Sequence, residues 1–347
     1  MKAGTRCRHS RSGQTVLILE EHESVWSEEA RAEVRACVAK VQAGLEGRGY
    51  RAICLQVKSP EALPELLAPY DPGTCIVFNW YEGVERSGRD CIQVAAQLDR
   101  LGYLYTGADA ATLRRTQDKV GTAALLQSSG VPTPVCVRIS EDKLPRWERY
   151  PAIVKLANEH GSECLTDESV VCDEQGLRRC VGELGAPADR PLMISEFIAG
   201  REFTISLWGN GHLEVLPIVE MDYSRLSPGL PHLRTYDAKW DPEAEAYRSI
   251  KLVSPPSAPA ALLTRIVDVA QSAYSACELR DYGRVDIRLH DEEPRVIDVN
   301  ANPDLAADSS FTLAAARAGM DSTAMVERII RLALRRGERA HEERLGG

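Results

Sequence analysis

The most restrictive feature of this sequence is a pair of short apolar runs near its carboxyl end, residues 283–289 (GRVDIRL) and residues 295–300 (RVIDVN). Both have the composition and alternation of strands, and each carries one aspartate inside the run, Asp286 in the first and Asp298 in the second. The five residues that join them, 290–294, have a length typical of hairpin connections. The sequence therefore predicts an antiparallel hairpin with a carboxylate on each strand.

The register of this hairpin brings the two carboxylates together. A loop centred on Glu292 pairs Asp286 with Asp298 and Arg284 with Asn300. Side chains alternate between the two faces of a strand, so all four polar side chains lie on one face. Two unit charges about 5 Å apart, at an effective dielectric constant of about 20, repel each other by roughly 3 kcal/mol, and like charges that face each other across a sheet destabilise it. This face therefore needs a partner of opposite charge.

Two explanations satisfy this requirement. In the first, the two carboxylates and the amide oxygen of Asn300 bind a cation, and hard oxygen ligands of this kind suit the Mg²⁺ that accompanies substrate phosphates. In the second, the face is solvated, and Arg288 and Arg295 neutralise the acids. The hairpin alone does not decide between them.

Length and charge exclude several classes of protein. A chain of 347 residues has the length of two or three domains, and its formal net charge of −9 argues against binding to a nucleic-acid backbone. The ten cysteines form no C-x-x-C pair, so we expect reduced thiols in a cytoplasmic protein. The basic leader, residues 1–14, precedes an apolar run too short for a signal peptide, and no run approaches the ~20 apolar residues of a membrane span. We therefore expect neither a nucleic acid nor a membrane as a partner.

The first third of the chain alternates strands and helices. Residues 16–19, 51–57 and 74–80 read as strands, and residues 30–45 and 92–102 have the apolar spacing of helices. This order predicts βαβ units with a parallel sheet. No G-x-G-x-x-G follows the first strand and no G-x-x-x-x-G-K-[ST] occurs in the chain, which excludes a dinucleotide fingerprint there and a P-loop.

The rest of the chain gives further strands and helices. We expect one long helix over residues 111–129, a strand over 151–156 with Lys155 as its last polar residue, and a strand over 192–198. A hairpin over 202–220 should turn at Asn210 and Gly211, and a long helix should follow and end at Cys277. A terminal helical segment follows from about Thr312, and the charged end is expected to fray.

Five motifs in this order resemble the ATP-grasp superfamily, and within it the D-alanine–D-alanine ligase-like branch. They are YTGADAATLRRTQDKVGTAALLQSSGVPTP, YPAIVKLANEHGS, SEFIAGREFTISLWGNG, RTYDAKW, and the set DYGRVDIRL, RVIDVNANPDL and AARAGMD. Each motif alone is weak, and the five in order, over about residues 78–334, form a specific signal.

The resemblance implies an α/β protein with the ATP-grasp fold, in which a parallel α/β domain is followed by two domains whose antiparallel sheets hold ATP between them. The implied units are a disordered leader at 1–14, an N-terminal α/β domain at 15–118, a central subdomain with a lid loop at 119–201, a catalytic domain at 202–335 and a tail at 336–347.

The resemblance also implies a nucleotide site. Its phosphate contacts are Lys119, Lys155 and Lys239. Adenine is read by the main chain of a hinge segment, and a carboxylate accepts hydrogen bonds from the ribose hydroxyls. These residues match Glu196, Phe197 and Ile198 for the hinge and Glu202 for the ribose.

For the opening hairpin, the resemblance favours the metal explanation. Asp286, Asp298 and Asn300 match the metal ligands, with Mg²⁺ as the expected ion and Mn²⁺ as its substitute. Arg284 matches the residue that stabilises charge on the transferring phosphoryl group. In the lid loop, Gly161 and Ser162 offer backbone N–H groups to anionic oxygen, and Lys239 completes the catalytic set.

The implied enzyme is an ATP-dependent carboxylate–amine ligase. A carboxylate attacks the γ-phosphate to give an acyl phosphate and ADP, and an amine then displaces phosphate to form an amide. Two other functions stay open: an ATP-grasp enzyme that phosphorylates an enolic or keto oxygen before amine addition, and a catalytically silent nucleotide-binding scaffold.

Departures from the D-alanine–D-alanine ligase pattern lie on the substrate side. Trp240 stands where those enzymes have tyrosine, Asp304 replaces a glycine near the acyl oxyanion, and Gly161 replaces a serine. With Ser309, Trp240 and Asp304 are the expected substrate contacts, and the acidic loop 20–29 is a further candidate. We therefore expect a small amino acid or amino-acid-like metabolite other than D-alanine as substrate, with homodimer formation left open.

Overall fold

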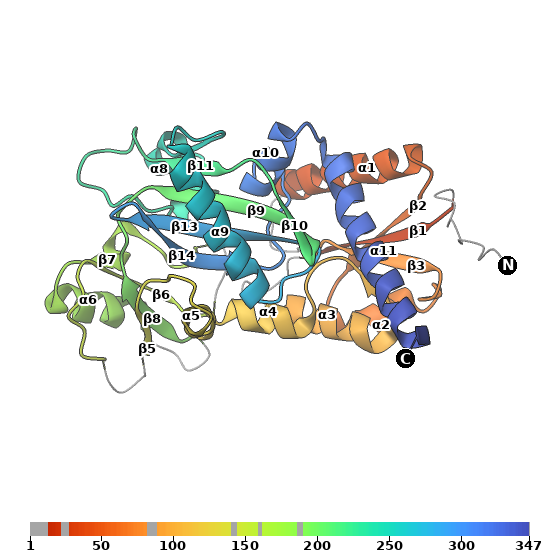
Figure 1. Cartoon of the computed structure of the whole chain (residues 1–347), viewed down its shortest axis with the longest axis horizontal. Helices are drawn as coiled ribbons and strands as arrows, with labels where there is room; N and C mark the ends of the chain where they lie inside the picture. The colour runs from red at the N-terminus through yellow and green to blue at the C-terminus, as the bar shows by residue number, and fades with distance from the viewer. Residues whose placement is uncertain are drawn as a thin grey trace.

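The computed structural model describes residues 13–21, 28–81, 89–139, 144–158, 162–185 and 190–346. It is a mixed α/β structure with three separate sheets (Figure 1). One sheet is parallel and two are antiparallel, as the sequence predicted. Residues 1–12, most of the acidic loop 20–29 and Gly161 lie outside the described residues.

The N-terminal sheet is parallel and has the strand order β2-β1-β3-β4. Its first three strands were predicted, whereas the two-residue strand β4 is too short to leave a periodic signal. The strands are β1 (Thr15–Glu21), β2 (Arg51–Val57), β3 (Cys75–Asn79) and β4 (Leu104–Tyr105). The helices of this unit are α1 (Glu28–Gly47), α2 (Leu63–Leu67) and α3 (Arg89–Leu101), with a 3₁₀ turn at Pro60–Ala62.

The helix predicted over residues 111–129 is two helices, α4 (Ala110–Gln117) and α5 (Lys119–Ser128). Asp118 interrupts it with an extended backbone (φ −77°, ψ 91°), and its side chain accepts a hydrogen bond from the Gly121 N–H. Aspartate at this position caps the second helix and satisfies one of its free N–H groups. The break therefore places Lys119 at the first position of α5.

The middle sheet is antiparallel with the strand order β5-β8-β6-β7. Its own apolar core lies between the sheet and helix α6 (Glu174–Leu184), and contains Ala152, Val154 and Leu156 from β6. Alternate side chains of β6, Ile153 and Lys155, project from the opposite face. The strands are β5 (Cys136–Ile139), β6 (Ala152–Leu156), β7 (Val170–Val171) and β8 (Leu192–Glu196), with a 3₁₀ turn at Asp167–Ser169.

The third sheet has six strands, in the order β12-β11-β9-β13-β14 with β10 paired to β9. Helix α9 (Ala260–Ala276) lies across one face and packs on the apolar side chains of β9 and β13, while the short helices α7 (Asp237–Trp240) and α8 (Glu245–Ser249) lie between β11 and β12 in the chain (Figure 1). The strands are β9 (Glu202–Asn210), β10 (His212–Val215), β11 (Val219–Asp222), β12 (Lys251–Val253), β13 (Tyr282–His290) and β14 (Glu293–Asn300).

The β13–β14 connection is tighter than the five-residue loop that we expected. His290 pairs with Glu293, so only Asp291 and Glu292 form the turn, and both have positive φ (48° and 63°). Two consecutive positive φ angles are typical of the turn type whose twist suits a hairpin. The expected loop length was therefore wrong.

A β-bulge restores the predicted pairing. Ile287 pairs with Val296 and Asp286 pairs with Asp298, which leaves Ile297 as an extra residue on β14. Val296 and Val299 both reach the core under α9, although they are three residues apart. Without the bulge, the two-residue turn would bring Asp298 to the core face, because a shift of one residue exchanges the faces of a strand.

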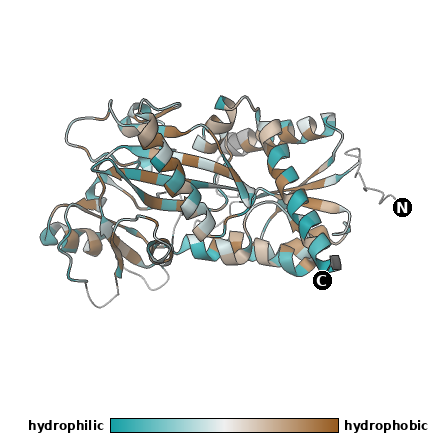
Figure 2. Cartoon of the chain, in the orientation of Figure 1, coloured by the Kyte–Doolittle hydropathy of each residue, from teal (hydrophilic) through white to brown (hydrophobic). Residues whose placement is uncertain are grey.

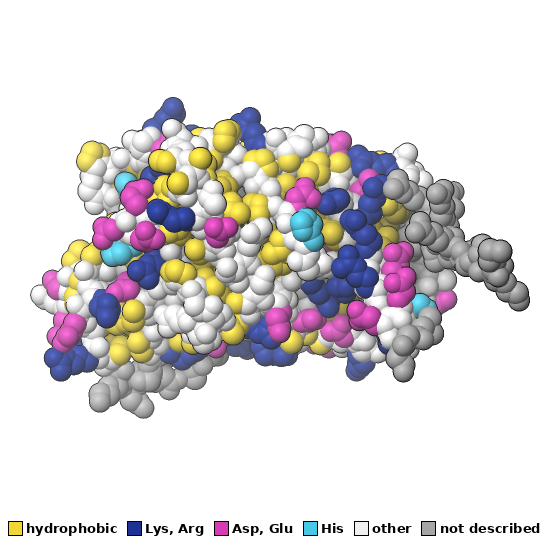
Figure 3. All heavy atoms as spheres, viewed as in Figure 1, with side chains coloured by type: hydrophobic (Ala, Val, Ile, Leu, Met, Phe, Trp, Pro, Cys, Tyr) yellow, Lys and Arg dark blue, Asp and Glu magenta, His cyan; other side chains and the backbone are white. Residues whose placement is uncertain are grey.

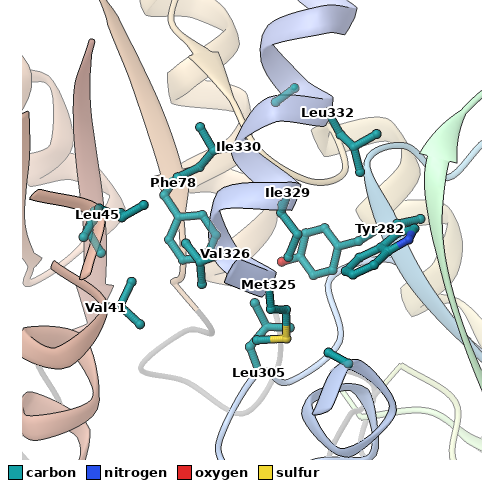
Figure 4. Packing of buried hydrophobic residues seen from close by; sticks show 14 of the residues in the cluster. Val41, Leu45, Phe78, Tyr282, Leu305, Met325, Val326, Ile329, Ile330 and Leu332 are labelled. Atoms are coloured by element: carbon teal, nitrogen blue, oxygen red, sulfur yellow. The ribbon is translucent and has the colours of Figure 1, made fainter. Parts of the chain in front are cut away.

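Helices α10 (Ser310–Arg317) and α11 (Ser322–Gly346) return the chain to the N-terminal sheet. Figure 4 shows α11 side chains packed between Val41 and Leu45 of α1, Phe78 of β3 and Tyr282 of β13. Helix α11 continues to Gly346, and Arg336 is paired with the buried Asp281 at 2.9 Å. The charged end expected to fray is therefore helical and held at its start.

The distribution of apolar and charged side chains agrees with the composition of the chain. Apolar segments line the interiors of the sheets, as the colouring of Figure 2 shows, and acidic and basic side chains both occur over much of the face drawn in Figure 3. No helix among the residues that the structure describes combines the length and apolar character required to cross a bilayer.

Candidate active site

One face of the six-stranded sheet carries a polar array across three adjacent strands, opposite to the face covered by α9. The register pairs Glu202 with Arg288, Thr204 with Asp286, and Ser206 with Arg284 between β9 and β13. On the other side of β13, Asp286 pairs with Asp298 and Arg284 with Asn300, which confirms the predicted pairing. We call these side chains the polar face: Glu202, Thr204, Ser206, Arg284, Asp286, Arg288, Asp298 and Asn300.

Within the polar face, Asp286 is bound by two neighbours. Arg284 forms a bidentate pair with its carboxylate, from Nε to Oδ1 and from Nη2 to Oδ2, both at 3.0 Å. The amide nitrogen of Asn300 donates to Oδ2 at 3.2 Å. Burial raises the pKa of Asp286 and the nearby Asp298 adds to this, while Arg284 opposes it. The carboxylate repulsion inferred from the sequence is therefore offset in part by a buried guanidinium.

Asp298 is paired across to a different unit of the fold. Its Oδ1 lies 3.0 Å from Nζ of Lys119, at the start of α5. The Lys119 N–H donates to the carbonyl of Ala157 at 3.0 Å, which ties the start of α5 to the end of β6. The helix break at Asp118 therefore positions Lys119 between the middle sheet and the polar face.

Two further lysines point their charge into this region. Burial and, to a lesser extent, the nearby Lys119 lower the pKa of Lys155 to about 8, while Asp298 opposes them. Burial likewise lowers the pKa of Lys239, on α7, to about 8, and Arg284 contributes in the same direction. The three predicted phosphate lysines thus come together, from α5, β6 and α7, beside the carboxylates. Such a cluster of desolvated cations is suited to a polyanion.

The polar face also fits the predicted metal. Asp286 and Asp298 supply carboxylate oxygens, and Asn300 can supply its amide oxygen once the amide rotates by half a turn. The hydroxyls of Thr204 and Ser206, directly across from Asp286 and Arg284, are buried and have no hydrogen-bond partner among the residues that the structure describes, so they are open to a hydrated ligand. In the described part of the chain, no group of three or more histidine, cysteine or acidic side chains is placed to hold a metal, so the amide of Asn300 is needed to complete the ligand set.

The hinge segment (residues 196–198) leaves one main-chain donor open. The N–H groups of Glu196 and Phe197 donate to the carbonyls of Val135 and Pro151. The side chain of Glu196 accepts from the Val135 N–H and from Arg149, so it turns away from the sheet-to-sheet space. Among the described residues, the Ile198 N–H has no acceptor.

Apolar side chains lie beside this hinge segment. Ile153, Leu165 and Leu233 form a small buried cluster that Phe197 packs against. Ile153 shares a strand face with Lys155, two residues further along β6. One strand therefore offers an apolar surface and, next to it, a cation.

Three comparisons with known proteins agree with this arrangement. Residues 136–331, more than half of the chain, match the family model described as D-ala D-ala ligase C-terminus. An uncharacterized protein y4sG of Sinorhizobium fredii is 33% identical over 78% of this chain and 79% of its own length. The D-alanine–D-alanine ligase of Carboxydothermus hydrogenoformans is 28% identical over 68% of this chain and 75% of its own. The chain belongs to the D-alanine–D-alanine ligase family.

Solved structures show the same fold. The D-alanine–D-alanine ligase from Bacillus anthracis, in complex with ATP, superposes with a TM-score of 0.73 at 19% identity over 94% of this chain and 99% of that chain. The VanG D-Ala:D-Ser ligase from Enterococcus faecalis gives a TM-score of 0.70 at 18% identity over 93% and 100% of the two chains. These two likenesses show the ATP-grasp fold. Together with the family match over residues 136–331, they identify the protein as an ATP-grasp ligase, an ATP-using enzyme that joins a carboxylate to an amine and forms ADP.

In this ligase the lid loop (residues 157–165) meets the segment before α7. The Ser162 hydroxyl donates to the carbonyl of Arg234 at 3.0 Å, and the Tyr236 N–H donates to the carbonyl of Leu165. Ser162 has a positive φ of 64°, so the loop turns sharply there. The hydroxyl is thus engaged in loop contacts, while Gly161, predicted with it, lies outside the described residues.

The three predicted substrate contacts of this ligase are placed differently from one another. Asp304 is half-buried near Arg284 and Lys239, and its Oδ1 accepts from the Ala306 N–H at 2.7 Å. Ser309 caps α10, with its hydroxyl bonded to Thr312. Trp240 is 58% exposed at the end of α7. Only Asp304 therefore lies within the charge cluster itself.

Sequence reasoning missed part of the polar face. Thr204 and Ser206 were not predicted to face the site, and neither was Tyr223, whose hydroxyl donates to Glu202 at 2.8 Å. Arg288 was considered only as a partner of the two aspartates, and its pairing with Glu202 was not predicted. A signal was present in the alternation of EFTIS against RVDIR, which pairs polar residues with polar residues in the antiparallel register.

Proposed function

We propose that this ligase activates the carboxylate of an amino-acid-like metabolite as an acyl phosphate and transfers the acyl group to an amine, releasing ADP and phosphate. The observation that carries this proposal is the gathering of Lys119, Lys155 and Lys239 beside the carboxylates of Asp286 and Asp298. Such a site can hold the triphosphate of ATP and its counter-ion next to the substrate carboxylate that accepts the phosphoryl group.

Nucleotide binding follows from the two facing sheets. The open Ile198 N–H and the apolar cluster around Phe197 suit adenine, and Glu202 suits the ribose hydroxyls. From there the phosphates would run along β6, past Ile153 to Lys155, and on to Lys119 at the start of α5. The contacts would be charge-assisted and strongest where the lysines are desolvated.

Mg²⁺ would be held by the carboxylates of Asp286 and Asp298 and by the amide oxygen of Asn300. When bound, the ion supplies neutralisation of charge between the terminal phosphates. Binding would release Lys119 and Arg284 from the carboxylates that they neutralise in the free protein. Arg284 would then be free to stabilise the charge that develops on the acyl and phosphoryl oxygens.

The chemistry has two balanced steps. A substrate carboxylate oxygen attacks the γ-phosphorus of ATP, and the bond to the β,γ-bridging oxygen breaks to leave ADP. A neutral amine then attacks the acyl carbon, phosphate leaves with the bonding electron pair, and the amine loses a proton. Lys239 and Arg284 are placed to balance the negative charge in both steps.

The substrate class is supported by a cavity of about 190 Å³ beside α7. Of its lining residues, Ala238 precedes Lys239 in the chain and the charge of Asp308 raises the pKa of Asp304. The lining carries both signs of charge, as a zwitterionic amino acid requires. Its lining consists of Arg234, Ala238, Tyr247, Ile250, Lys251, Leu252 and Asp308.

The test is ATP-dependent product formation with a panel of amino acids and amino-acid-like acids, each offered with an amine and Mg²⁺. We expect stoichiometric ADP and phosphate together with an amide identified by mass spectrometry. Pyrophosphate in place of phosphate, or a product phosphorylated at an enolic oxygen, would contradict the proposed reaction. ATP binding without turnover on any substrate would favour the scaffold function.

A further inference from the structure

On the polar face, the side chain of Arg288 lies beside Glu202, the residue proposed to contact the ribose, and it takes no part in the reaction described above. It is almost fully buried, with 3% of its surface exposed, and its guanidinium donates to groups from four different segments. A buried guanidinium with this many acceptors is costly to desolvate, so its retention beside the ribose position calls for a function.

One part of its network fixes Glu202. Arg288 Nε donates to Glu202 Oε2 at 2.9 Å, and its Nη2 donates to the same oxygen. The Tyr223 hydroxyl also donates to Oε2, at 2.8 Å. Among the described residues, no hydrogen bond reaches Oε1, and this atom is not enclosed. Three donors therefore saturate Oε2 and leave Oε1 available to a further donor.

The other part of the network joins the surrounding main chain. Arg288 Nη1 donates to the carbonyl of Ile198 at 2.8 Å, and Nη2 donates to the carbonyl of His232. The guanidinium also lies 5.3 Å from the ring centroid of Phe197 and 5.7 Å from that of Tyr223. The same residue thus links the hinge segment to the segment that contacts the lid loop.

Charge supports the same arrangement. Burial alone would raise the pKa of Glu202, but Arg288 and the hydrogen bond from Tyr223 outweigh burial and hold this pKa below its usual value. The buried carboxylate therefore stays ionised, and an ionised carboxylate oxygen is a strong acceptor for a hydroxyl group.

We propose that Arg288 is a positioning residue for nucleotide selection: it saturates Oε2 of Glu202 and presents Oε1, ionised and oriented, to a ribose hydroxyl, so that the ligase discriminates ATP from a deoxynucleotide. This inference rests on the proposed nucleotide site. It assigns no role in phosphoryl transfer to Arg288.

The experiment measures dissociation constants of ATP, 2′-deoxy-ATP and 3′-deoxy-ATP by calorimetry for the full-length protein in Mg²⁺. The wild type is expected to bind ATP roughly tenfold to a hundredfold more tightly than at least one deoxy analogue, the loss of one hydrogen bond to a charged group. In Arg288→Met this ratio should fall to about threefold or less, because Glu202 loses its orienting partner. Arg288→Lys, which keeps the charge but not the fork of donors, should give an intermediate ratio.

Matched variants separate orientation from folding. Arg201→Met removes a second bidentate arginine–glutamate pair of the same sheet, Arg201 with Glu220 at 2.6 Å, and should leave the ratio unchanged. Tyr223→Phe removes a single donor to Oε2 and should lower the ratio slightly; it serves if Arg288→Met does not fold.

The outcomes are distinct. A wild type that binds no ATP refutes the nucleotide site itself. A wild type that binds ATP without discriminating against either analogue refutes the role of Oε1. Unchanged discrimination in a folded Arg288→Met protein, or in Tyr223→Phe if Arg288→Met does not fold, refutes the positioning role, whatever the effect on overall affinity.

Discussion

Replacing Lys155 with methionine should make the nucleotide-free ligase more stable and less able to bind ATP. Lys155 is desolvated on β6 without a hydrogen bond or ion pair to the described residues, and burial lowers its pKa from 10.5 to about 8. Holding this ammonium charged in the free protein costs on the order of 3 kcal/mol, at about 1.4 kcal/mol for each tenfold change in the proton equilibrium. Methionine keeps the apolar stem and removes the charge.

The lowered pKa of Lys155 also determines how the stability of the wild type changes with pH. The folded-state pKa is lower than the unfolded-state value, so between pH 8 and 10.5 the unfolded chain binds more protons and the free energy of unfolding of the wild type rises with pH. The cost is complete below pH 8 and absent above 10.5. At pH 7 the gain in Lys155→Met should therefore be about 1–3 kcal/mol, and it should disappear as the pH passes through this window.

The assay is urea unfolding at several pH values, with and without ATP and Mg²⁺. With nucleotide, this gain should largely or wholly disappear, because the variant loses a charge-assisted phosphate contact of about 1.5–3 kcal/mol, which is about as large as the gain itself. Lys58→Met, at an exposed lysine of the N-terminal unit, is the matched control and should change neither value. A nucleotide-free Lys155→Met protein that is less stable than the wild type at pH 7, or a gain that persists at pH 10.5, would refute the reasoning.

Three other outcomes are expected. Asp298→Ala should keep its fold, because Asp298 lies on the open polar face, but lose most turnover; near-normal activity at low Mg²⁺ would show that the metal assignment is wrong. Asp118→Ala should lose its cap on the Gly121 N–H and its pair with Arg138, which should lower stability by about 1 kcal/mol. It should also raise the KM for ATP, because Lys119 is displaced. An unchanged KM in a destabilised variant would show that the cap does not position Lys119 for ATP. The protein should form little or no D-alanyl-D-alanine at millimolar D-alanine, and robust dipeptide formation would contradict a rebuilt substrate pocket.

The sequence correctly predicted that the two site carboxylates face each other, although the predicted loop between their strands was too long. Centring a five-residue link on Glu292 gives the correct partners for Asp286, although the turn has two residues, because the bulge at Ile297 shifts the register back by one. Bulges depend on packing across the sheet, here of Val296 and Val299 under α9, and a single strand does not report that packing.

Other differences also have tertiary causes. Residues 111–129 have a continuous helical pattern, and only the contact of Lys119 with Ala157 at the end of β6 shows why Asp118 interrupts it. From the sequence alone, β9 resembles an ordinary buried strand. Only its register with β13 shows that its polar side chains belong to the polar face. Arg288, which only the solvated-face explanation used as a partner of the two aspartates, binds Glu202, a residue distant in the chain.

The ion pair between Lys119 and Asp298 bears on how quickly the enzyme can turn over. In the free protein this lysine neutralises a carboxylate that the proposed metal and nucleotide would claim during the reaction. Nucleotide entry would therefore exchange one set of charge contacts for another, so part of the binding energy would be spent on breaking the pair. After the γ-phosphate has gone, ADP makes fewer contacts, and the re-formed pair competes directly with it. We expect the pair to hasten product departure at the expense of ground-state affinity.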